Sequence, residues 1–268
     1  MRKVFDMLRL DGKVALITGA RQGLGYDIAC ALAEAGATIV ISSRNQESVK
    51  AVANEISETY GVKTYTVELD QKDYNSVQNA VDYVLKTTGR IDILVNNAGG
   101  GSGASEGYIV DRDPLAIKDM IDVNLTGMLY CSKAVAKHMI DRGSGKIINL
   151  GSIAGVVGRD RAMYYKAKKM QQPIDYSAAK GGVISATRDL AGLLSPSGIC
   201  VNSISPGGFD KGELSPEFVR LYSEETPLGR MGKIGEDIKG VALLLASDAG
   251  NYITGQNILV DGGFSIWK

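Results

Sequence analysis

A tyrosine and a lysine four positions apart are the residues of this chain best suited to proton transfer. Tyr176 and Lys180 enclose the run YSAAK, and residues at this spacing share one face of a helix. An ammonium group beside a phenol favours the phenolate and lowers the pKa of the tyrosine. Ser152, in NLGSIAG, carries a hydroxyl that can polarise a carbonyl, and Asn124 lies further upstream in DVNLTG. Together these four residues describe a proton relay for reducing a ketone or oxidising an alcohol.

A glycine-rich segment near the start of the chain is a second candidate site. The apolar run at 14–18 is followed by TGARQGLG, and an alanine-rich helical pattern continues to Ala35. Glycines between a strand and a helix let the backbone approach a pyrophosphate, and the helix N-terminus supplies N–H groups and partial positive charge. The spacing T-G-x-x-x-G-x-G differs from the common fingerprint G-x-G-x-x-G. Its place between a predicted strand and a predicted helix still favours a dinucleotide-binding loop over an ordinary turn.

Apolar runs alternate with helical patterns along the whole chain. Predicted strands lie near 14–18, 38–42, 63–67, 91–95, 146–150, 199–204 and 257–260, and predicted helices near 23–35, 46–59, 74–88, 114–140, 176–194 and 235–247. This alternation predicts a single α/β domain of the Rossmann type, with a doubly wound, seven-stranded, mostly parallel sheet and helices on both faces. The glycine loop, NNAG at 96–99, Ser152 and Pro206-Gly207 each follow a predicted strand. They should therefore share the carboxyl edge of the sheet, where such folds bind ligands.

Composition narrows the class of partner. The 268 residues carry as many basic as acidic side chains, which gives no reason to expect a nucleic acid or an anionic membrane surface as partner. No apolar run is long enough to span a bilayer, and residues 1–11 are charged throughout, unlike a signal peptide. The three widely spaced cysteines favour reduced thiols, and the single histidine, His138, has no neighbouring cysteine with which to bind a metal. We therefore expect a cytoplasmic protein with a small-molecule substrate, no metal and no membrane partner.

The ordered set of motifs resembles the short-chain dehydrogenase/reductase family, in its single-domain branch, from about residue 13 to 264. RLDGKVALITGA, PLGRMG and ITGQNILVDGG are further similar to gluconate 5-dehydrogenases and 3-oxoacyl-acyl-carrier-protein reductases. The resemblance implies hydride transfer with a nicotinamide cofactor, Tyr176 as general acid or base, Lys180 on the nicotinamide ribose, Ser152 orienting the carbonyl and Asn124 organising the Lys180 side. It also implies a homotetramer. The residues assigned to the cofactor are Gly19, Arg21, Gly23, Leu24, Gly25, Ser43, Arg44, Asp70, Asn97, Ala98, Gly99, Tyr176, Lys180, Pro206 and Gly207.

The end of the second predicted strand, IVISSRN, bears on the choice of cofactor. A carboxylate here would accept hydrogen bonds from the adenosine ribose and select NAD. The chain has Ser43 instead, followed by Arg44, which can bind a 2'-phosphate, and Arg21 adds charge. NADP(H) is therefore predicted as the preferred cofactor, with NAD(H) possible. By the resemblance, Asp70 contacts adenine, and Lys211 could replace a phosphate-binding threonine that relatives carry after Pro206-Gly207.

Two further tyrosine–lysine pairs, Tyr164 with Lys168 and Tyr165 with Lys169, have the same spacing as the relay. Ser152 lies nearer the usual family distance from Tyr164. The apolar, glycine- and alanine-rich continuation YSAAKGGVISATRDLAGLL nevertheless suits a buried helix, and this favours Tyr176. The run YYKAKKMQQ is polar and basic, and it predicts an exposed insertion near 158–174 that borders the substrate mouth or serves an interface.

Three functions remain open. The first is an NADP(H)-dependent oxidoreductase acting on a sugar acid, polyol or similar small polar substrate. The second is a reductase of carrier-bound 3-oxoacyl groups. The third is a nucleotide-binding scaffold or sensor without turnover, against which the complete Asn–Ser–Tyr–Lys set argues. An acidic carrier would need a basic docking surface, which the predicted insertion could supply through Arg159, Arg161, Lys166, Lys168 and Lys169. Pocket walls come from loops with no readable code, so the sequence does not specify the substrate.

Overall fold

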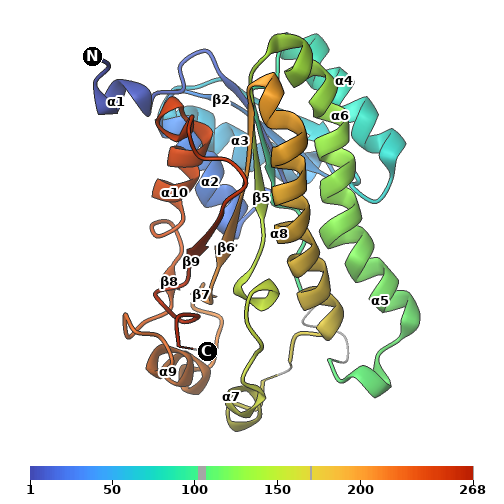
Figure 1. The fold of residues 1–268 in the computed structure, drawn as a ribbon, viewed down its shortest axis with the longest axis vertical. Helices are drawn as coiled ribbons and strands as arrows, with labels where there is room; N and C mark the ends of the chain where they lie inside the picture. The colour runs from blue at the N-terminus through green and yellow to red at the C-terminus, as the bar shows by residue number, and fades with distance from the viewer. Residues whose placement is uncertain (102–106, 170, 268) are drawn as a thin grey trace.

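A parallel sheet runs through the centre of the computed structural model, which describes residues 1–101, 107–169 and 171–267 (Figure 1). The order in the seven-stranded sheet is β3-β2-β1-β4-β5-β6-β9, and every neighbouring pair is parallel. The strands are β1 (Val14–Thr18), β2 (Thr38–Ser43), β3 (Thr64–Glu68), β4 (Ile93–Asn96), β5 (Gly145–Leu150), β6 (Ile199–Pro206) and β9 (Asn257–Val260). The order reverses between β1 and β4, which is where doubly wound sheets bind their ligands. The predicted fold class is confirmed.

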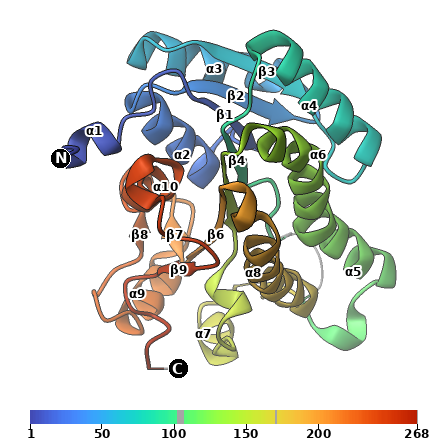
Figure 2. The ribbon, with the colours of Figure 1, turned by 45° about the horizontal axis from the view of Figure 1, so that its top comes forward.

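Helices cover both faces of the sheet (Figure 2). Two hydrophobic clusters separate the helices from the strands, one on each face. One face carries α2 (Gly23–Glu34), α3 (Glu47–Tyr60) and α10 (Lys239–Ala246), and the other carries α4 (Tyr74–Thr88), α6 (Gly127–Arg142) and α8 (Ile174–Leu194). Strands β1, β4 and β5 are buried along their whole length, as their continuous apolar runs require.

The helix predicted over 114–140 is not uniform. It consists of α5 (Pro114–Ile121), a π-helical turn η2 (Asp122–Thr126) and α6. The apolar pattern of the segment did not reveal this turn. Turns of this kind are frequent at functional sites, and this one holds Asn124.

The helix predicted over 235–247 begins later than expected, at Lys239. The preceding residues form a turn instead. In this turn the Asp237 carboxylate accepts the Lys233 N–H at 2.7 Å and pairs with Arg230 at 2.5 Å.

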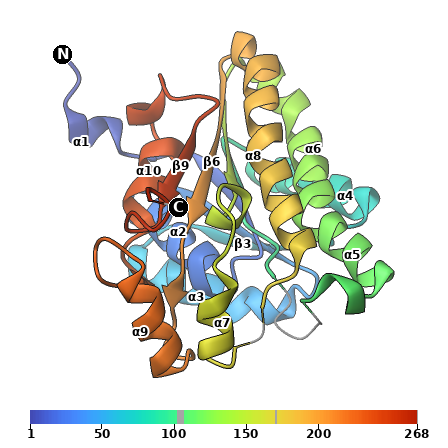
Figure 3. The ribbon, with the colours of Figure 1, turned by 60° about the horizontal axis from the view of Figure 1, so that its bottom comes forward.

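Several elements beyond the carboxyl edge were not predicted. Helices α7 (Arg161–Lys166) and α9 (Pro216–Glu224) lie side by side there (Figure 3). The remaining short elements are α1 (Val4–Met7), the paired β7 (Phe209–Asp210) and β8 (Gly232–Lys233), and the 3-10 turns η1 (Ile109–Asp111), η3 (Ile153–Gly155), η4 (Ser195–Ser197) and η5 (Asp248–Gly250). Among the described residues, no helix has both the length and the hydropathy that crossing a bilayer would need.

The segment predicted as an exposed insertion is partly buried. Met163 and Tyr164 in α7 are only 5% and 9% exposed. The Tyr164 ring packs on Phe218 of α9 at 5.3 Å between centroids. The expectation of an exposed segment was wrong for these two residues, because α9 supplies a hydrophobic surface that the local basic pattern could not reveal. Met170 of this segment lies outside the described residues.

Candidate active site

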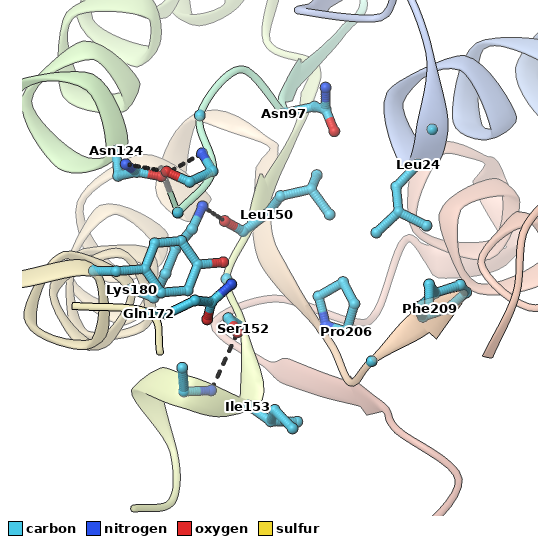
Figure 4. Close-up of a pocket in the computed structure, with 18 of the residues that line it drawn as sticks. Leu24, Asn97, Asn124, Leu150, Ser152, Ile153, Gln172, Lys180, Pro206 and Phe209 are labelled. Carbon is cyan, nitrogen blue, oxygen red and sulfur yellow. Dashed lines mark hydrogen bonds between the residues drawn. The ribbon is translucent and has the colours of Figure 1, made fainter. Parts of the chain in front are cut away.

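Tyr176 and Lys180 lie one turn apart on α8, and both are buried. The Lys180 Nζ donates a hydrogen bond of 2.7 Å to the carbonyl of Leu150, the last residue of β5 (Figure 4). The same nitrogen lies 5.8 Å from the centroid of the Tyr176 ring. The helix therefore holds the phenol and the ammonium group together against the end of a central strand.

Ser152 reaches this pair from the loop that follows β5. Its backbone is extended, and its Oγ accepts the Ala154 N–H at 3.1 Å, which starts the turn η3. A Cβ added to Gly155 would lie 2.5 Å from the Gly181 nitrogen, so glycine lets this turn approach α8. The Ser152 hydroxyl faces the Tyr176 phenol and acts to lower its pKa.

Burial sets the protonation of the pair. It raises the pKa of Tyr176, and the Ser152 hydroxyl and the positive charge of Arg159 only partly offset this effect. Burial also lowers the pKa of Lys180 to about 8. The expectation that the lysine lowers the tyrosine pKa is therefore wrong for this structure, because desolvation of the phenolate dominates. A raised pKa keeps the phenol protonated and able to donate.

Asn124 fastens the loop after β4 beside Lys180. Its Oδ1 accepts the Gly100 N–H at 2.9 Å, and its Nδ2 donates to the Gly100 carbonyl at 3.2 Å (Figure 4). Its Nδ2 also donates to the Met120 carbonyl at 3.1 Å. A Cβ added to Gly99, whose φ is +142°, would lie 2.6 Å from Asn124 Oδ1 and 3.8 Å from Lys180 Nζ. The sequence predicted the proximity of Asn124 to Lys180, but not these backbone contacts.

The glycine loop packs tightly on the loop after β4. Gly19 has a φ of +66°, and a Cβ there would lie 2.8 Å from the Ala98 Cα. The Asn97 Nδ2 donates to the carbonyls of Thr18 and Gly19 at 2.8 and 3.1 Å, and a Cβ at Gly25 would collide with this same amide. Glycine is thus required at both positions for the two loops to meet.

A cleft of about 1040 Å³ runs along the carboxyl edge of the sheet. All the predicted catalytic and cofactor-binding residues line it except Gly25, which is buried behind Asn97. Leu24, Pro206 and Phe209 face the side that holds Lys180 and Asn124 (Figure 4). Tertiary folding therefore brings the glycine loop and the proton relay into one cleft.

The end of the cleft at β2 and β3 is polar. The Ser43 Oγ accepts the Asn45 N–H at 3.3 Å, and the neighbouring Arg44 is exposed. The Asp70 Oδ1 accepts the Lys72 N–H at 3.0 Å. The Lys211 amine, at the other side of the glycine loop, would lie 3.0 Å from a Cβ added to Gly23. Two cationic side chains, Arg44 and Lys211, are thus available to phosphate groups.

The opposite end of the cleft has aromatic and methionine walls that the sequence did not predict. The Tyr222 hydroxyl accepts the Gly208 N–H at 2.6 Å, which ties α9 to the loop after β6. The cap signal of α9 was readable, since Ser215 precedes Pro216 and its Oγ accepts the Phe218 N–H at 3.3 Å. The wall residues are Met163, Tyr164, Phe218, Tyr222, Met231 and Phe264.

Comparisons with known proteins identify relatives along the whole chain. The family model described as "Enoyl-(Acyl carrier protein) reductase" matches residues 19–265. The 3-oxoacyl-[acyl-carrier-protein] reductase of Aquifex aeolicus is 35% identical over 96% of this chain and 98% of its own. The NADP-dependent mannitol dehydrogenase of Hypocrea jecorina is 35% identical over 98% of this chain and 96% of its own. The structure of a gluconate 5-dehydrogenase from Burkholderia cenocepacia in complex with NADP and tartrate superposes with a TM-score of 0.88, at 34% identity, over 98% of this chain and 99% of that chain.

The fold and these relatives define an α/β oxidoreductase that acts on alcohols and ketones. The chain belongs to the short-chain dehydrogenase/reductase family. This confirms the resemblance inferred from the motifs.

Proposed function

We propose that this protein is an NADP(H)-dependent oxidoreductase that interconverts a secondary alcohol and a ketone on a small polar substrate, most nearly a sugar acid. The observation that carries the proposal is the buried pair of Tyr176 and Lys180, with the Lys180 amine bound to the Leu150 carbonyl and Ser152 lining the same cleft. This arrangement lies in the same cleft as the glycine loop.

The proposed chemistry assigns one task to each side chain. Tyr176 is protonated because burial raises its pKa, so in reduction it donates its proton to the carbonyl oxygen of the substrate. Ser152 orients that oxygen and stabilises the negative charge that develops on it. The positive charge of Lys180 stabilises the phenolate that forms. Asn124 holds the loop at Gly99 and Gly100 in place beside Lys180. In oxidation the same groups act in the reverse direction.

The glycine loop fits a dinucleotide. Gly19 and Gly25 remove the side chains that would separate the loops after β1 and β4, and the N-terminus of α2 follows directly, where a pyrophosphate is favourable. The nicotinamide group supplies or accepts the hydride when the cofactor is bound. Ser43, Arg44 and Lys211 support NADP(H) over NAD(H), and the Burkholderia cenocepacia relative is in complex with NADP.

The basic residues of α7 and its flanks support a small substrate rather than an acyl carrier. Arg159 donates to the Gln172 carbonyl at 2.7 Å, and Arg161 donates to Gln171 Oε1 at 2.9 Å. Both guanidinium groups are half-buried, and Lys166 and Lys168 are the exposed cations among the described residues of this segment. This is a weak docking surface for an acidic partner.

Steady-state oxidation of NADPH over a panel of ketones tests the proposal. The panel contains 5-keto-D-gluconate, the neutral ketohexose L-sorbose, cyclohexanone and a 3-oxoacyl thioester. We expect turnover of a small polar ketone. A kcat/KM that is highest for the thioester would support the carrier-linked function instead, and no turnover with any member would contradict the proposal.

A further inference from the structure

Arg159 lies beside the proposed proton donor, in the segment between Ser152 and Tyr176. Its guanidinium carbon is 5.7 Å from the centroid of the Tyr176 ring. Arg159 also lines the cleft, together with Tyr164 and Lys169. The positive charge therefore lies at the end of the cleft where the substrate, rather than the adenosine part of a cofactor, would be.

Among the residues that the structure describes, this guanidinium has only neutral hydrogen-bond partners. Its NH1 donates to the Gln172 carbonyl at 2.7 Å, and its NH2 donates to the Ser177 hydroxyl at 2.6 Å. Its Nε is buried without a hydrogen-bond partner in the part of the chain that the structure describes. The neighbouring Asp160 carboxylate is exposed and accepts the Ala162 N–H at 2.8 Å.

Arg112, which is buried whereas Arg159 is half-buried, shows how the chain pairs such a group for structural purposes. Arg112 donates from Nε and NH2 to the Asp175 carboxylate at 3.2 and 2.7 Å, and both side chains are 2% exposed. Even partial burial of a cation without an anion is unfavourable. Burial indeed lowers the pKa of Arg159, and the positive charge of Arg161 lowers it further.

We propose that Arg159 binds a carboxylate of the substrate and so makes the enzyme select oxo and hydroxy acids over neutral ketones and polyols. The inference rests on the proposed function and specifies its substrate class. A carboxylate would give the guanidinium the charge-assisted, geometrically defined pairing that it lacks in the protein. Lys169, whose Nζ lies 5.1 Å from the Phe218 ring centroid, adds a second positive charge at this end of the cleft.

A matched pair of ketones tests the inference. 5-Keto-D-gluconate and L-sorbose share a carbon chain, and L-sorbose has a hydroxymethyl group in place of the carboxylate. We expect the wild-type enzyme to prefer the acid. Arg159→Gln should reduce the ratio of kcat/KM for the acid to that for L-sorbose by about 10- to 150-fold, the loss expected for one charge-assisted hydrogen bond. The loss should be mainly in KM for the acid, and Arg159→Lys should restore part of the ratio.

Arg161→Gln is the matched control, because Arg161 also donates to the Gln172 carbonyl, at 3.1 Å, and does not line the cleft. It should keep the wild-type ratio. If Arg159→Gln lowers kcat/KM equally for both substrates, Arg159 only holds the segment in place and the inference is wrong. An unchanged ratio would overturn it as well.

Failure of the inference can be distinguished from failure of the proposed function. Wild-type turnover of L-sorbose or cyclohexanone without a preference for the acid would overturn the role of Arg159 and leave the oxidoreductase proposal intact. If no ketone is turned over, calorimetric titration of 5-keto-D-gluconate into the NADP-loaded protein gives the second measurement. Equal affinity for the wild type and Arg159→Gln would then overturn the inference, and weaker binding to the variant would support it.

Discussion

At the scale of single residues, the proposed chemistry depends on Tyr176, whose pKa burial raises. The local spacing of YSAAK predicts a phenol and an amine on one helix face, and this is what α8 presents. The direction of the pKa shift is the opposite of the one that the pairing alone predicts. The environment of Tyr176 therefore favours the form that donates a proton, which is the form that ketone reduction requires.

Tyr176→Phe should lower kcat by about 10²–10⁴-fold, because it removes the donated proton and little else. NADP(H) binding, measured by calorimetry, should remain close to that of the wild type. Tyr165→Phe is the matched control on an exposed side chain, and Tyr164→Phe tests the competing pair; both variants should retain turnover. An inactive Tyr164→Phe variant would show that Tyr164, and not Tyr176, donates the proton.

Lys180 should make stability depend on pH. Its pKa is about 8 in the folded protein, whereas an unfolded chain gives the lysine its ordinary pKa of 10.5. Between these values the unfolded chain binds more protons, so this group contributes a stability that rises with pH. The free energy of unfolding of the wild type relative to Lys180→Met should therefore increase by about 2 kcal/mol from pH 8 to 9.5. Denaturant titrations of both proteins measure this difference, and a flat or falling difference would contradict the lowered pKa.

Ser43 and Arg44 should determine the choice of cofactor. A charge-assisted hydrogen bond to the 2'-phosphate is worth about 1.5–3 kcal/mol, so kcat/KM for NADPH should exceed that for NADH by about 10- to 150-fold. Arg44→Ala should weaken NADPH alone, and Ser43→Asp should reverse the preference, because a carboxylate repels the phosphate and binds ribose hydroxyls. Equal use of the two cofactors by the wild type would contradict the predicted preference. A lower kcat/KM for both cofactors in Arg44→Ala would mean that Arg44 has a structural role.

At the scale of elements, the N-terminal end of α8 is anchored by a buried ion pair. Asp175 immediately precedes Tyr176 and binds Arg112, which follows the turn η1. The pair connects the segment after β4 to the helix that carries the relay. Because both side chains are buried, replacing one of them removes a charge-assisted contact from the interior.

Asp175→Asn should lower the free energy of unfolding by about 3–5 kcal/mol, because the Arg112 charge would lose its buried partner. The double variant Arg112→Met/Asp175→Leu should recover much of this loss, since it leaves no charge to desolvate. Thermal and denaturant unfolding of the three proteins measure both effects. An Asp175→Asn variant as stable as the wild type would show that the pair does not stabilise this part of the fold.

At the scale of the whole molecule, hydrophobic side chains remain exposed on the helices and at the chain end expected to form a tetramer. Leu129 on α6 is 39% exposed and Leu193 on α8 is 74% exposed. Ile266 and Trp267, near the C-terminus, are 73% and 62% exposed. Other apolar residues of the same helices, such as Val135 and Val183, are buried within the subunit.

We expect a homotetramer, because assembly through these surfaces would remove the exposed apolar side chains from water. Light scattering at micromolar concentration measures the mass directly. A monomer mass would contradict the expectation and would mean that the apolar runs of α6 and α8 serve only the core.

The sequence by itself determined the sheet and the glycine loop, and it predicted which residues form the proposed relay. Apolar runs, glycines between a strand and a helix, and the i, i+4 spacing of Tyr176 and Lys180 are local patterns whose physical meaning needs no distant partner. The carboxyl edge follows from them, because strands in a parallel sheet end on one side. For the same reason, the grouping of Ser152 with the glycine loop could be predicted.

Only the tertiary structure decided the pKa of Tyr176, the burial of Tyr164 and the environment of Arg159. The burial of Tyr164 depends on its packing against Phe218 of α9, which is far away in the sequence. The environment of Arg159 depends on which groups fold against it, and among the described residues these do not include a carboxylate partner. Desolvation and pairing are properties of a position in three dimensions, whereas a sequence pattern reports only which neighbours share a helix face or a strand.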